Sequence, residues 1–464
     1  MSRKRVERDS VGELELPLDV YYGVQSLRAK INFPITGQSL RKEQIEGLAL
    51  IKQAAAQTNL KFARLDQKKA EAIEKTCQEI LAGKLHEAFI TDPIQGGAGT
   101  SANMNANEVI ANRAGELLGA ELGSYAEVHP NDHVNLGQST NDVYPTSGKI
   151  AALKLLDTAL PKLEDLAKAL AQKAEEFDDV IKVGRTQLQD AVPIRLGQEF
   201  AAYAKAVRRG IEQIKTAREG IYTINMGATA IGTGITASKE YLEEIVPTLA
   251  KLSGYPFVQA DDLVDGTQHI DVFVDLSAAL KQCSIALSKC ANDLRLMSMG
   301  PRAGLGEIHL PARQNGSSIM PGKINPVLPE VVSQVCYAIC GNDMTITMAA
   351  EGGQLELNPF EPVLFYKLFE SIEALGNVAE TFRIHCVEGI TANRERCQYL
   401  LDNSLATITA LAPIIGYTHT AAIAEEAMAK GETIAEILAE QKDLEHLNFE
   451  EIMDARKLTE PFAD

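Results

Sequence analysis

The chain has 464 residues, of which 45% are hydrophobic and 23% are charged, and its formal net charge at pH 7 is −18. This length allows two or three domains and a large buried core. A nucleic-acid partner requires clustered Lys and Arg, so the acidic charge argues against one, whereas a small anionic substrate stays possible.

The seven cysteines form no CxxC pair and lie at no metal-ligand spacing. This usage predicts reduced, buried thiols in a cytoplasmic protein. The N-terminal "MSRKRVERDS" has basic residues without an apolar stretch behind it, and no apolar run approaches transmembrane length. We therefore expect a cytoplasmic protein with neither a nucleic-acid nor a membrane partner.

Two early segments place neutral hydrogen-bond donors at predicted helix starts. "GGAGTSANMN" offers Thr100, and "HVNLGQSTND" offers Ser139, Thr140 and Asn141. N-capping accounts for one such residue per helix, and for either segment alone it is a sufficient explanation. The excess of donors favours an oxygen-rich ligand, which the positive ends of the helix dipoles would also attract.

Long helices are predicted from about residue 141 to 394. Apolar residues recur at three- and four-residue steps from Leu156 to Phe177, with Pro161 marking either a kink or the first turn of a new helix. Similar stripes cover 196–217, 271–298 and the segment after Pro329. Strand signals are weak, and we expect only short pieces near Val134 and Ile181. Stripes this wide predict a mainly α protein built around a long-helix bundle that assembles into an oligomer.

Two further segments carry similar donors. "GRTQLQDAVP" presents Thr186 and Gln187 before the helical stripe that starts near Leu196. In "GSSIMPGKINP", residues 316–326, the Gly and Pro residues forbid a regular element. The second segment is either a plain connector or a loop that places Ser317, Lys323 and Asn325 against a ligand.

The final residues change to short acidic helices, which predicts a small C-terminal domain. The expected organisation is an N-terminal domain of residues 1–140, a central helical bundle domain of residues 141–394 and a small C-terminal domain of residues 395–464.

In their order along the chain, "GAGTS", "QSTND", "GRTQLQDAVP" and "GSSIMPGKINP" resemble the blocks of the aspartase/fumarase superfamily, and the resemblance extends from Tyr21 to Phe365. It is closer to the aspartate ammonia-lyases than to the fumarases, which tend to read GSGTQ and GRTHTQDA. The resemblance implies the three-domain fold of that superfamily. It also implies a homotetramer in which the helical centres of four chains form one multi-helix core and each site is shared between subunits.

This resemblance implies reversible deamination of L-aspartate to fumarate and ammonia. It makes Ser317 the base that takes a C3 proton, which leaves an aci-carboxylate dianion to be stabilised. The other residues that it assigns bind substrate: Thr100, Ser139, Thr140, Asn141, Thr186, Gln187, Ser318, Met320, Lys323 and Asn325. It implies no metal ligands and no required cofactor, and it leaves open whether a divalent cation activates the reaction.

Several assignments stay open. Many relatives carry His at position 187, and because Gln cannot donate a proton as an acid, Gln187 counts modestly against a fumarase. Arg28 either reaches the second carboxylate or forms a salt bridge, His133 either orients the "QSTND" turn or is structural, and Glu330 either supports the loop or simply begins a helix. Cys336 and Cys340 are expected core residues.

Two alternative functions remain. Within the enzymes, the chain could be a fumarase or a substituted-aspartate lyase. Outside them, it could be a structural helical protein that keeps the lyase fold, although a scaffold has no use for Ser317, Lys323, Asn325 and Thr100.

Overall fold

The computed structural model describes residues 3–460, which fall into two compact units. The first unit comprises the chain up to Leu160 together with Glu212–Gln282 and Tyr337–Leu375. The second comprises Pro161–Ile211, Cys283–Cys336 and the chain from Gly376 onward. The predicted domain boundaries at residues 140 and 394 stay predictions.

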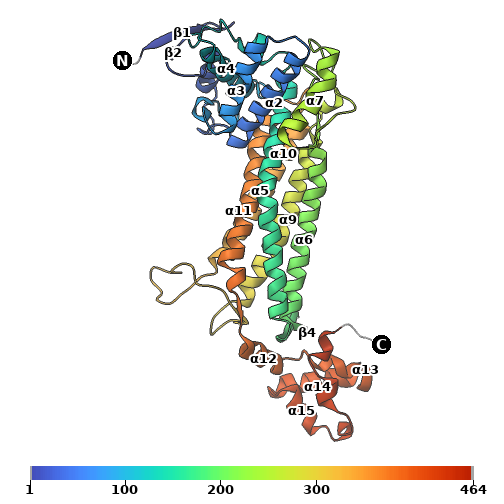
Figure 1. Ribbon diagram of the computed structural model, residues 1–464. Coiled ribbons are helices and arrows are strands. Elements are labelled where there is room, and N and C mark those ends of the chain that lie inside the picture. The colour runs from blue at the N-terminus through green and yellow to red at the C-terminus, as the bar shows by residue number, and fades with distance from the viewer. Residues whose placement is uncertain (1–2, 461–464) are drawn as a thin grey trace. The chain divides into compact units, whose positions relative to one another are not determined.

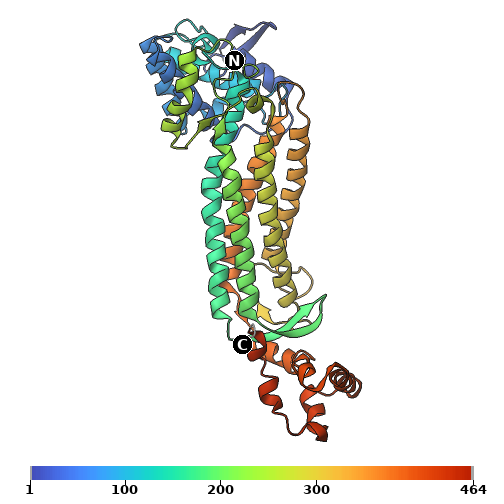
Figure 2. The ribbon, with the colours of Figure 1, turned by 90° about the vertical axis from the view of Figure 1, so that its right-hand side faces the viewer.

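Long helices dominate both units, so the predicted mainly α architecture is confirmed (Figures 1 and 2). Within each unit the long helices run side by side, and each of them continues from one unit into the other. They are α5 (Thr140–Glu176), α6 (Leu196–Ile221), α9 (Asp271–Met297), α10 (Val327–Glu351) and α11 (Glu361–His385). Helix α5 runs unbroken through Pro161, so no new helix begins there, and the kink stays a prediction.

Aromatic side chains hold three of these helices together in the first unit. The Phe365 ring of α11 lies with its centroid 5.5 Å from that of Tyr144 on α5 and 5.0 Å from that of Phe273 on α9. A Cβ atom at Gly148 would come within 2.1 Å of Phe365, so the glycine permits this close approach of α5 and α11. The result is a fixed starting point for α5, where one of the donor segments lies.

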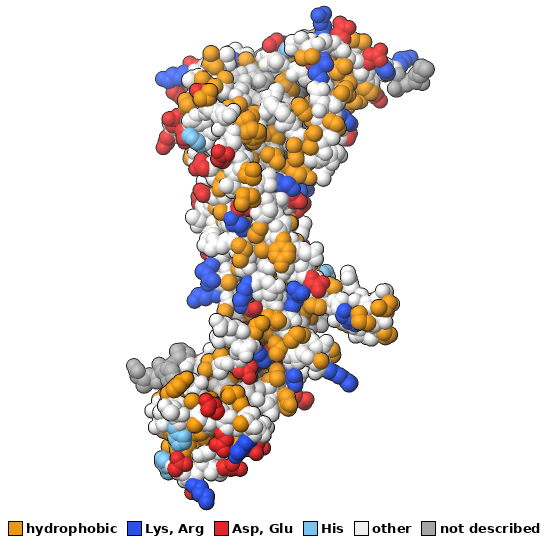
Figure 3. Space-filling view, turned by 180° about the vertical axis from the view of Figure 1, so that it is seen from behind, with side chains coloured by type: hydrophobic (Ala, Val, Ile, Leu, Met, Phe, Trp, Pro, Cys, Tyr) orange, Lys and Arg blue, Asp and Glu red, His pale blue; other side chains and the backbone are white. Residues whose placement is uncertain are grey.

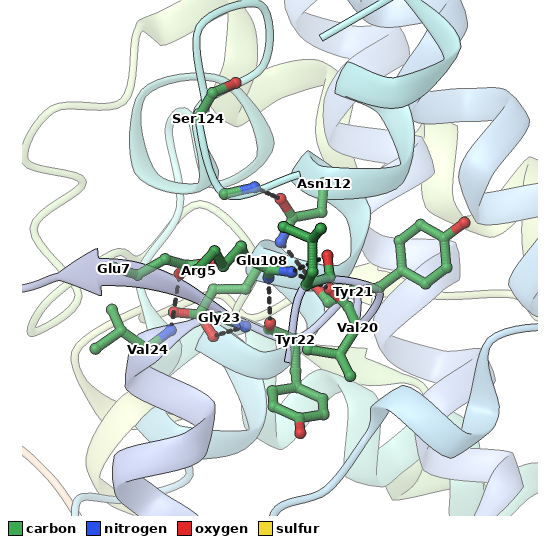
Figure 4. A network of polar contacts seen from close by, with 12 residues as sticks. Arg5, Glu7, Val20, Tyr21, Tyr22, Gly23, Val24, Glu108, Asn112 and Ser124 are labelled. Atoms are coloured by element: carbon green, nitrogen blue, oxygen red, sulfur yellow. Dashed lines mark hydrogen bonds and ion pairs between the residues drawn. The ribbon is translucent and has the colours of Figure 1, made fainter. Parts of the chain in front are cut away.

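The rest of the first unit is a set of shorter elements. The Glu108 carboxylate on α4 fastens the N-terminal segment to this unit by accepting the backbone N–H of Gly23 (Figure 4). It also accepts the backbone N–H groups of Gln25 and Ser26. On the same segment, the Arg5 guanidinium donates to the carbonyl of Val20 at 2.8 Å. The shorter elements are β1 (Lys4–Arg8), β2 (Glu13–Pro17), α1 (Val24–Asn32), α2 (Lys42–Lys61), α3 (Gln67–Leu81), η1 (His86–Ala88), α4 (Thr100–Leu117), η2 (Pro130–Val134), β5 (Thr223–Ile224), α7 (Lys239–Ser253), β6 (Val258–Gln259) and α8 (Asp265–Gln268).

One strand prediction is wrong and the other is confirmed. Val134 ends η2, a π-helical turn, and is buried, so tertiary packing overrides the β preference of its branched side chain. Ile181 begins β3 (Ile181–Thr186), which pairs in antiparallel register with β4 (Gln189–Arg195) in the second unit.

The second unit packs the remaining halves of the long helices with a C-terminal segment. Tyr203 on α6 donates to Asp293 on α9 at 2.8 Å, and Lys162 on α5 pairs with Glu380 on α11 at 2.9 Å. Its shorter elements are β7 (Ile308–His309), η3 (Val387–Gly389), β8 (Thr391–Ala392), α12 (Arg394–Asp402), η4 (Ile408–Leu411), α13 (Ala412–Ile415), α14 (Tyr417–Lys430), α15 (Ile434–Glu440), η5 (Lys442–Leu444), α16 (Phe449–Ile452) and η6 (Lys457–Thr459).

The C-terminal segment has a hydrophobic cluster of its own, which includes Leu411, Ile423 and Ile437. This cluster accounts for the ability of several short acidic helices to fold there, since each alone is too short to be stable.

All seven cysteines are free of disulfides. Six are buried, including Cys336, and Cys340 is half-buried, as expected for small residues of the core. Across residues 3–460, no helix combines the length and apolar character that a membrane crossing requires.

Candidate active site

Thr100 is the first residue of α4, and a turn in the left-handed region delivers it there. Gly97, Ala98 and Gly99 have φ angles of 93°, 54° and 87°. A Cβ at Gly99 would lie 2.2 Å from the Tyr144 ring, so this position requires glycine both for its backbone and for its space. The Thr100 hydroxyl donates to the carbonyl of Gly97 at 2.7 Å, and its side chain is exposed.

Asp142 fixes the donor segment at the start of α5. Its carboxylate is fully buried and accepts the backbone N–H groups of Ser139, Gly227 and Thr229 at 3.0, 3.2 and 3.0 Å. Burial raises the pKa of Asp142 to about 6, against the opposing effect of these hydrogen bonds. The carboxylate thereby joins the "QSTND" turn to the segment after Asn225.

The three predicted ligand-binding residues of this turn differ in how far they are already engaged. The Asn141 amide donates to the carbonyl of Ala230 at 2.6 Å, and the Ser139 hydroxyl oxygen accepts the Asn141 N–H at 3.2 Å. The Thr140 hydroxyl oxygen accepts a hydrogen bond from Asn103 at 3.0 Å. Thr140 therefore keeps its own hydroxyl proton available for a ligand.

Arg28 and Thr100 line one cavity of about 560 Å³ in the first unit. Of the two roles left open for Arg28, the salt bridge is the one present, because its guanidinium contacts both carboxylate oxygens of Asp9 at 2.8 and 3.0 Å. His133 accepts the backbone N–H of His129 at 2.8 Å, which is the structural role, and burial lowers its pKa.

Thr186 and Gln187 lie at the exposed tip of the β3–β4 hairpin, not at a helix start as the sequence suggested. Thr186 pairs with Gln189, so Gln187 and Leu188 form a two-residue loop with φ angles of 54° and 63°. Positive φ at both central residues is the geometry that matches the twist of a hairpin, but it is normally signalled by Asn-Gly. Without a glycine the turn left no recognisable pattern.

The loop of residues 316–326 closes on itself around Ser317. The Gly316 N–H donates to the carbonyl of Lys323 at 2.9 Å, and the Asn325 amide donates to the carbonyl of Gly316 at 2.7 Å. Inside this closure, the Ser317 oxygen accepts the backbone N–H groups of Ile319 and Met320 at 3.1 and 2.9 Å. Ser317 is half-buried, whereas Ser318 and Met320 are exposed.

Lys323 and Asn325 face a cavity of about 800 Å³ in the second unit. Glu330 also lines this cavity and lies in the first turn of α10, so the structure is compatible with both roles left open for it. The predicted site residues thus form two sets, one in each unit. The first set is Thr100, Ser139, Thr140 and Asn141; the second is Thr186, Gln187, Ser317, Ser318, Met320, Lys323 and Asn325.

The sequence analysis missed a buried group beneath the first set. Lys52 on α2 is fully buried and donates to the side-chain oxygens of Asn135 and Gln138 at 2.9 and 2.8 Å. Its signal was a lysine inside the apolar run "GLALIKQAAA", where a charged side chain needs a specific partner.

Among residues 3–460, no group of three or more His, Cys, Asp and Glu side chains is placed to hold a metal ion. The expectation that no cofactor is required stays a prediction.

The family model described as "Lyase" matches residues 12–341, and the one described as "Fumarase C C-terminus" matches residues 408–460. The aspartate ammonia-lyase of Bacillus subtilis (strain 168) is 51% identical over 457 residues, covering 98% of this chain and 96% of that protein. The aspartate ammonia-lyase of Helicobacter pylori (strain ATCC 700392 / 26695) is 50% identical over 461 residues, covering 99% of this chain and 98% of that protein.

The chain belongs to the aspartase/fumarase superfamily. Solved structures of this superfamily have the same fold. The crystal structure of "fumarate lyase:delta crystallin from Brucella melitensis bound to cobalt" superposes with a TM-score of 0.96 at 47% identity, covering 99% of this chain and all of that one. The class II fumarase of Schistosoma mansoni gives a TM-score of 0.93 at 37% identity, covering 98% and 99% of the two chains. The predicted superfamily fold is therefore confirmed.

Proposed function

We propose that this superfamily member is an aspartate ammonia-lyase, a carbon–nitrogen lyase that reversibly converts L-aspartate into fumarate and ammonia. The observation that carries this proposal is the set of relatives named aspartate ammonia-lyase, which are 45% to 51% identical to the chain over nearly all of its length. The Schistosoma fumarase, at 37% identity, is less similar.

Ser317 is the proposed base. A serine hydroxyl is a weak acid, and its alkoxide is stabilised by donors aimed at the oxygen. The N–H groups of Ile319 and Met320 are such donors, and the loop supplies them from its own backbone. The alkoxide takes a proton from C3 of L-aspartate, and the electron pair of that C–H bond moves onto the adjacent carboxylate.

The resulting aci-carboxylate dianion needs positive potential and hydrogen-bond donors around it. Thr140 supplies a hydroxyl proton at the N-terminus of α5, where the helix dipole is positive. The Thr100 hydroxyl, at the N-terminus of α4, donates to a backbone carbonyl of its own turn and would turn to the substrate when it binds. Ser139 and Asn141 add donors beside Thr140, and Lys323 supplies a counter-charge. When the dianion collapses, the C–N bond breaks, ammonia departs and fumarate forms.

Gln187 and Thr186 line the amino side of the substrate in this proposal. Ammonium is a good leaving group, so the missing acid at position 187 does not impede deamination, whereas loss of water from malate would be more demanding. The elimination is not a redox reaction, so it needs no electron acceptor, and it transfers no chemical group to a second substrate. We therefore propose that it proceeds without a cofactor.

Incubation with L-aspartate and with L-malate, each followed by fumarate absorbance, tests the proposed substrate. We expect fumarate and an equal amount of ammonia from L-aspartate and little or no fumarate from L-malate. Faster conversion of L-malate would favour the fumarase alternative. Inactivity on both substrates and on substituted aspartates would favour a structural protein.

A homotetramer with shared sites is the proposed assembly. Between Val331 and Met348 the exposed positions of α10 carry no charge, and Tyr337, Met344 and Met348 are 65%, 62% and 66% exposed. Hydrophobic side chains are visible at the surface of the long helices in the space-filling view (Figure 3). Such an uncharged face along a long helix fits against helices of other copies. We further propose that the assembled enzyme is cytoplasmic, which agrees with its disulfide-free cysteines, and that it binds neither nucleic acid nor membranes.

A further inference from the structure

A chain of hydrogen bonds connects Lys52 with Thr140 in the first unit. Lys52 donates to the side-chain oxygen of Asn135 at 2.9 Å. The Asn103 amide nitrogen reaches that oxygen at 3.3 Å and the Thr140 hydroxyl oxygen at 3.0 Å. Asn103 is 1% exposed and Thr140 is 9% exposed, so water does not substitute freely for these partners.

Every bond of this chain has a defined direction. The protonated Lys52 side chain is only a donor, so the oxygens of Asn135 and Gln138 must face it. A neutral amine could also accept a hydrogen bond, but the amide hydrogens of Asn135 and Gln138 are used elsewhere. The remaining amide hydrogens agree with this orientation, because Asn135 donates to the Gln138 carbonyl at 3.2 Å and Gln138 donates to the Val134 carbonyl at 3.0 Å.

The side-chain amide of Asn103 is held in an orientation that leaves one of its polar atoms without a partner, which costs free energy. Its nitrogen serves Asn135 and Thr140, while its buried side-chain oxygen has no hydrogen-bond partner among the described residues. The reverse orientation would place that oxygen against the Asn135 oxygen and let it accept the Thr140 proton. Lys52 disfavours this reversal because its donated hydrogen bond, at 2.9 Å, holds the Asn135 oxygen in place. The Asn107 amide nitrogen reaches the same oxygen at a longer 3.2 Å, but it is neutral, whereas Lys52 can carry a positive charge.

We propose that Lys52 is a positioning residue, which sets the direction of this hydrogen-bond chain so that the Thr140 hydroxyl donates its proton to the bound substrate carboxylate. The inference rests on the proposed function, in which Thr140 binds that carboxylate. Burial lowers the pKa of Lys52 to about 7, and the nearby Asp142 carboxylate opposes this shift. The direction of the chain is the same on both sides of this pKa.

A double-mutant cycle between Lys52→Met and Thr140→Val tests the inference. Binding of succinate, a dicarboxylate without an amino group, is measured by calorimetry, together with kcat and KM for L-aspartate. In the wild-type background, Thr140→Val should weaken succinate binding about tenfold to a hundredfold, the usual range for a hydrogen bond to a charged group. In the Lys52→Met background it should weaken binding by less than about threefold, because the Thr140 proton then points to Asn103.

Lys154→Met is the matched control. Lys154 on α5 pairs with Glu46 on α2, so it links the same two helices without touching the hydrogen-bond chain. Thr140→Val should keep its full effect in this background. An equal effect of Thr140→Val in all three backgrounds would overturn the inference and leave Lys52 a structural residue.

Two further outcomes separate this inference from the proposed function. A wild-type protein that binds succinate but does not deaminate L-aspartate would overturn the proposed activity alone, and the calorimetric cycle would still decide the role of Lys52. A wild-type protein that binds no succinate would overturn both. If Lys52→Met fails to fold, Lys52→Gln replaces it. Its neutral amide can donate but can also accept, so it should fix the direction less firmly than the lysine, and the Thr140→Val effect should lie between those in the wild-type and Lys52→Met backgrounds.

Discussion

At the scale of single residues, the first donor set lies beside two buried groups, Asp142 and Lys52. Asp142 accepts three backbone N–H groups, and Lys52 donates to the side-chain oxygens of Asn135 and Gln138. Burying such polar groups costs free energy, and they stabilise the structure only when all of their hydrogen bonds are made. They explain why the "QSTND" turn presents its hydroxyl groups in one arrangement.

The stability of the protein should depend on pH through Asp142. Its folded pKa of about 6 lies above the ordinary value of 3.8, so the folded state binds a proton in this interval that the unfolded state has released. The contribution of Asp142 to the free energy of unfolding is therefore fully present below the ordinary pKa and is lost as pH rises through about 6.

Comparison with Asp142→Asn isolates this contribution. From about pH 4 to pH 7, the free energy of unfolding of the wild type should fall relative to that of the variant by on the order of 3 kcal/mol, because each pKa unit is worth about 1.4 kcal/mol. Thermal midpoints of both proteins across this range measure the difference. Parallel pH profiles would contradict the assignment.

Lys323 should act on substrate charge and not on folding. Lys323→Ala should lower kcat/KM for L-aspartate at least about thirtyfold. This corresponds to a loss of transition-state stabilisation on the order of 2 to 5 kcal/mol, because the ion pair between Lys323 and the substrate carboxylate would be desolvated in the complex. Lys323→Arg keeps the charge and should lose less. Steady-state kinetics and size-exclusion chromatography measure both effects, and unchanged kinetics would remove Lys323 from the site.

At the scale of elements, the turn before α4 places Thr100 by combining an unusual backbone with a close contact. Gly99→Ala should be strongly destabilising, because its φ of 87° is strained for alanine and the new Cβ would meet the Tyr144 ring. Gly119→Ala is the control: its φ is 91°, but a Cβ there meets nothing within 4 Å. The difference between the two losses of thermal stability measures the steric clash of the new Cβ with the Tyr144 ring. Equal losses in both variants would contradict this clash.

Periodicity predicted the long helices because an apolar stripe is a local property of the sequence. The hairpin turn at Gln187 and Leu188 could not be predicted, because its positive φ angles are imposed by the paired strands and no Gly or Asn marks the turn in the sequence. Lys52 escaped because its partners Asn135 and Gln138 lie more than 80 residues away along the chain. The resemblance predicted most of the candidate site residues, and no pattern of spacing alone would have assigned the two sets to one site.

At the scale of the whole molecule, the proposed tetramer carries a functional consequence. If each site takes blocks from several copies, Thr186→Ala and Lys323→Ala should each be strongly impaired alone, whereas subunits mixed by dissociation and reassociation should recover activity above that of either variant. A mixed assembly can place an intact hairpin tip and an intact loop around the same substrate. No recovery, despite proven exchange of subunits, would mean that one chain builds each site.

The central claim is that the loop of residues 316–326 deprotonates L-aspartate through Ser317, and turnover of Ser317→Ala tests it most directly, with Ser318→Ala as the neighbouring control. We expect Ser317→Ala to lower kcat by about 10² to 10⁴, the usual contribution of a positioned proton-transfer group, while succinate binding is largely kept. Ser318→Ala should lower kcat less. Near-normal turnover of Ser317→Ala, or a larger loss in Ser318→Ala, would contradict the claim.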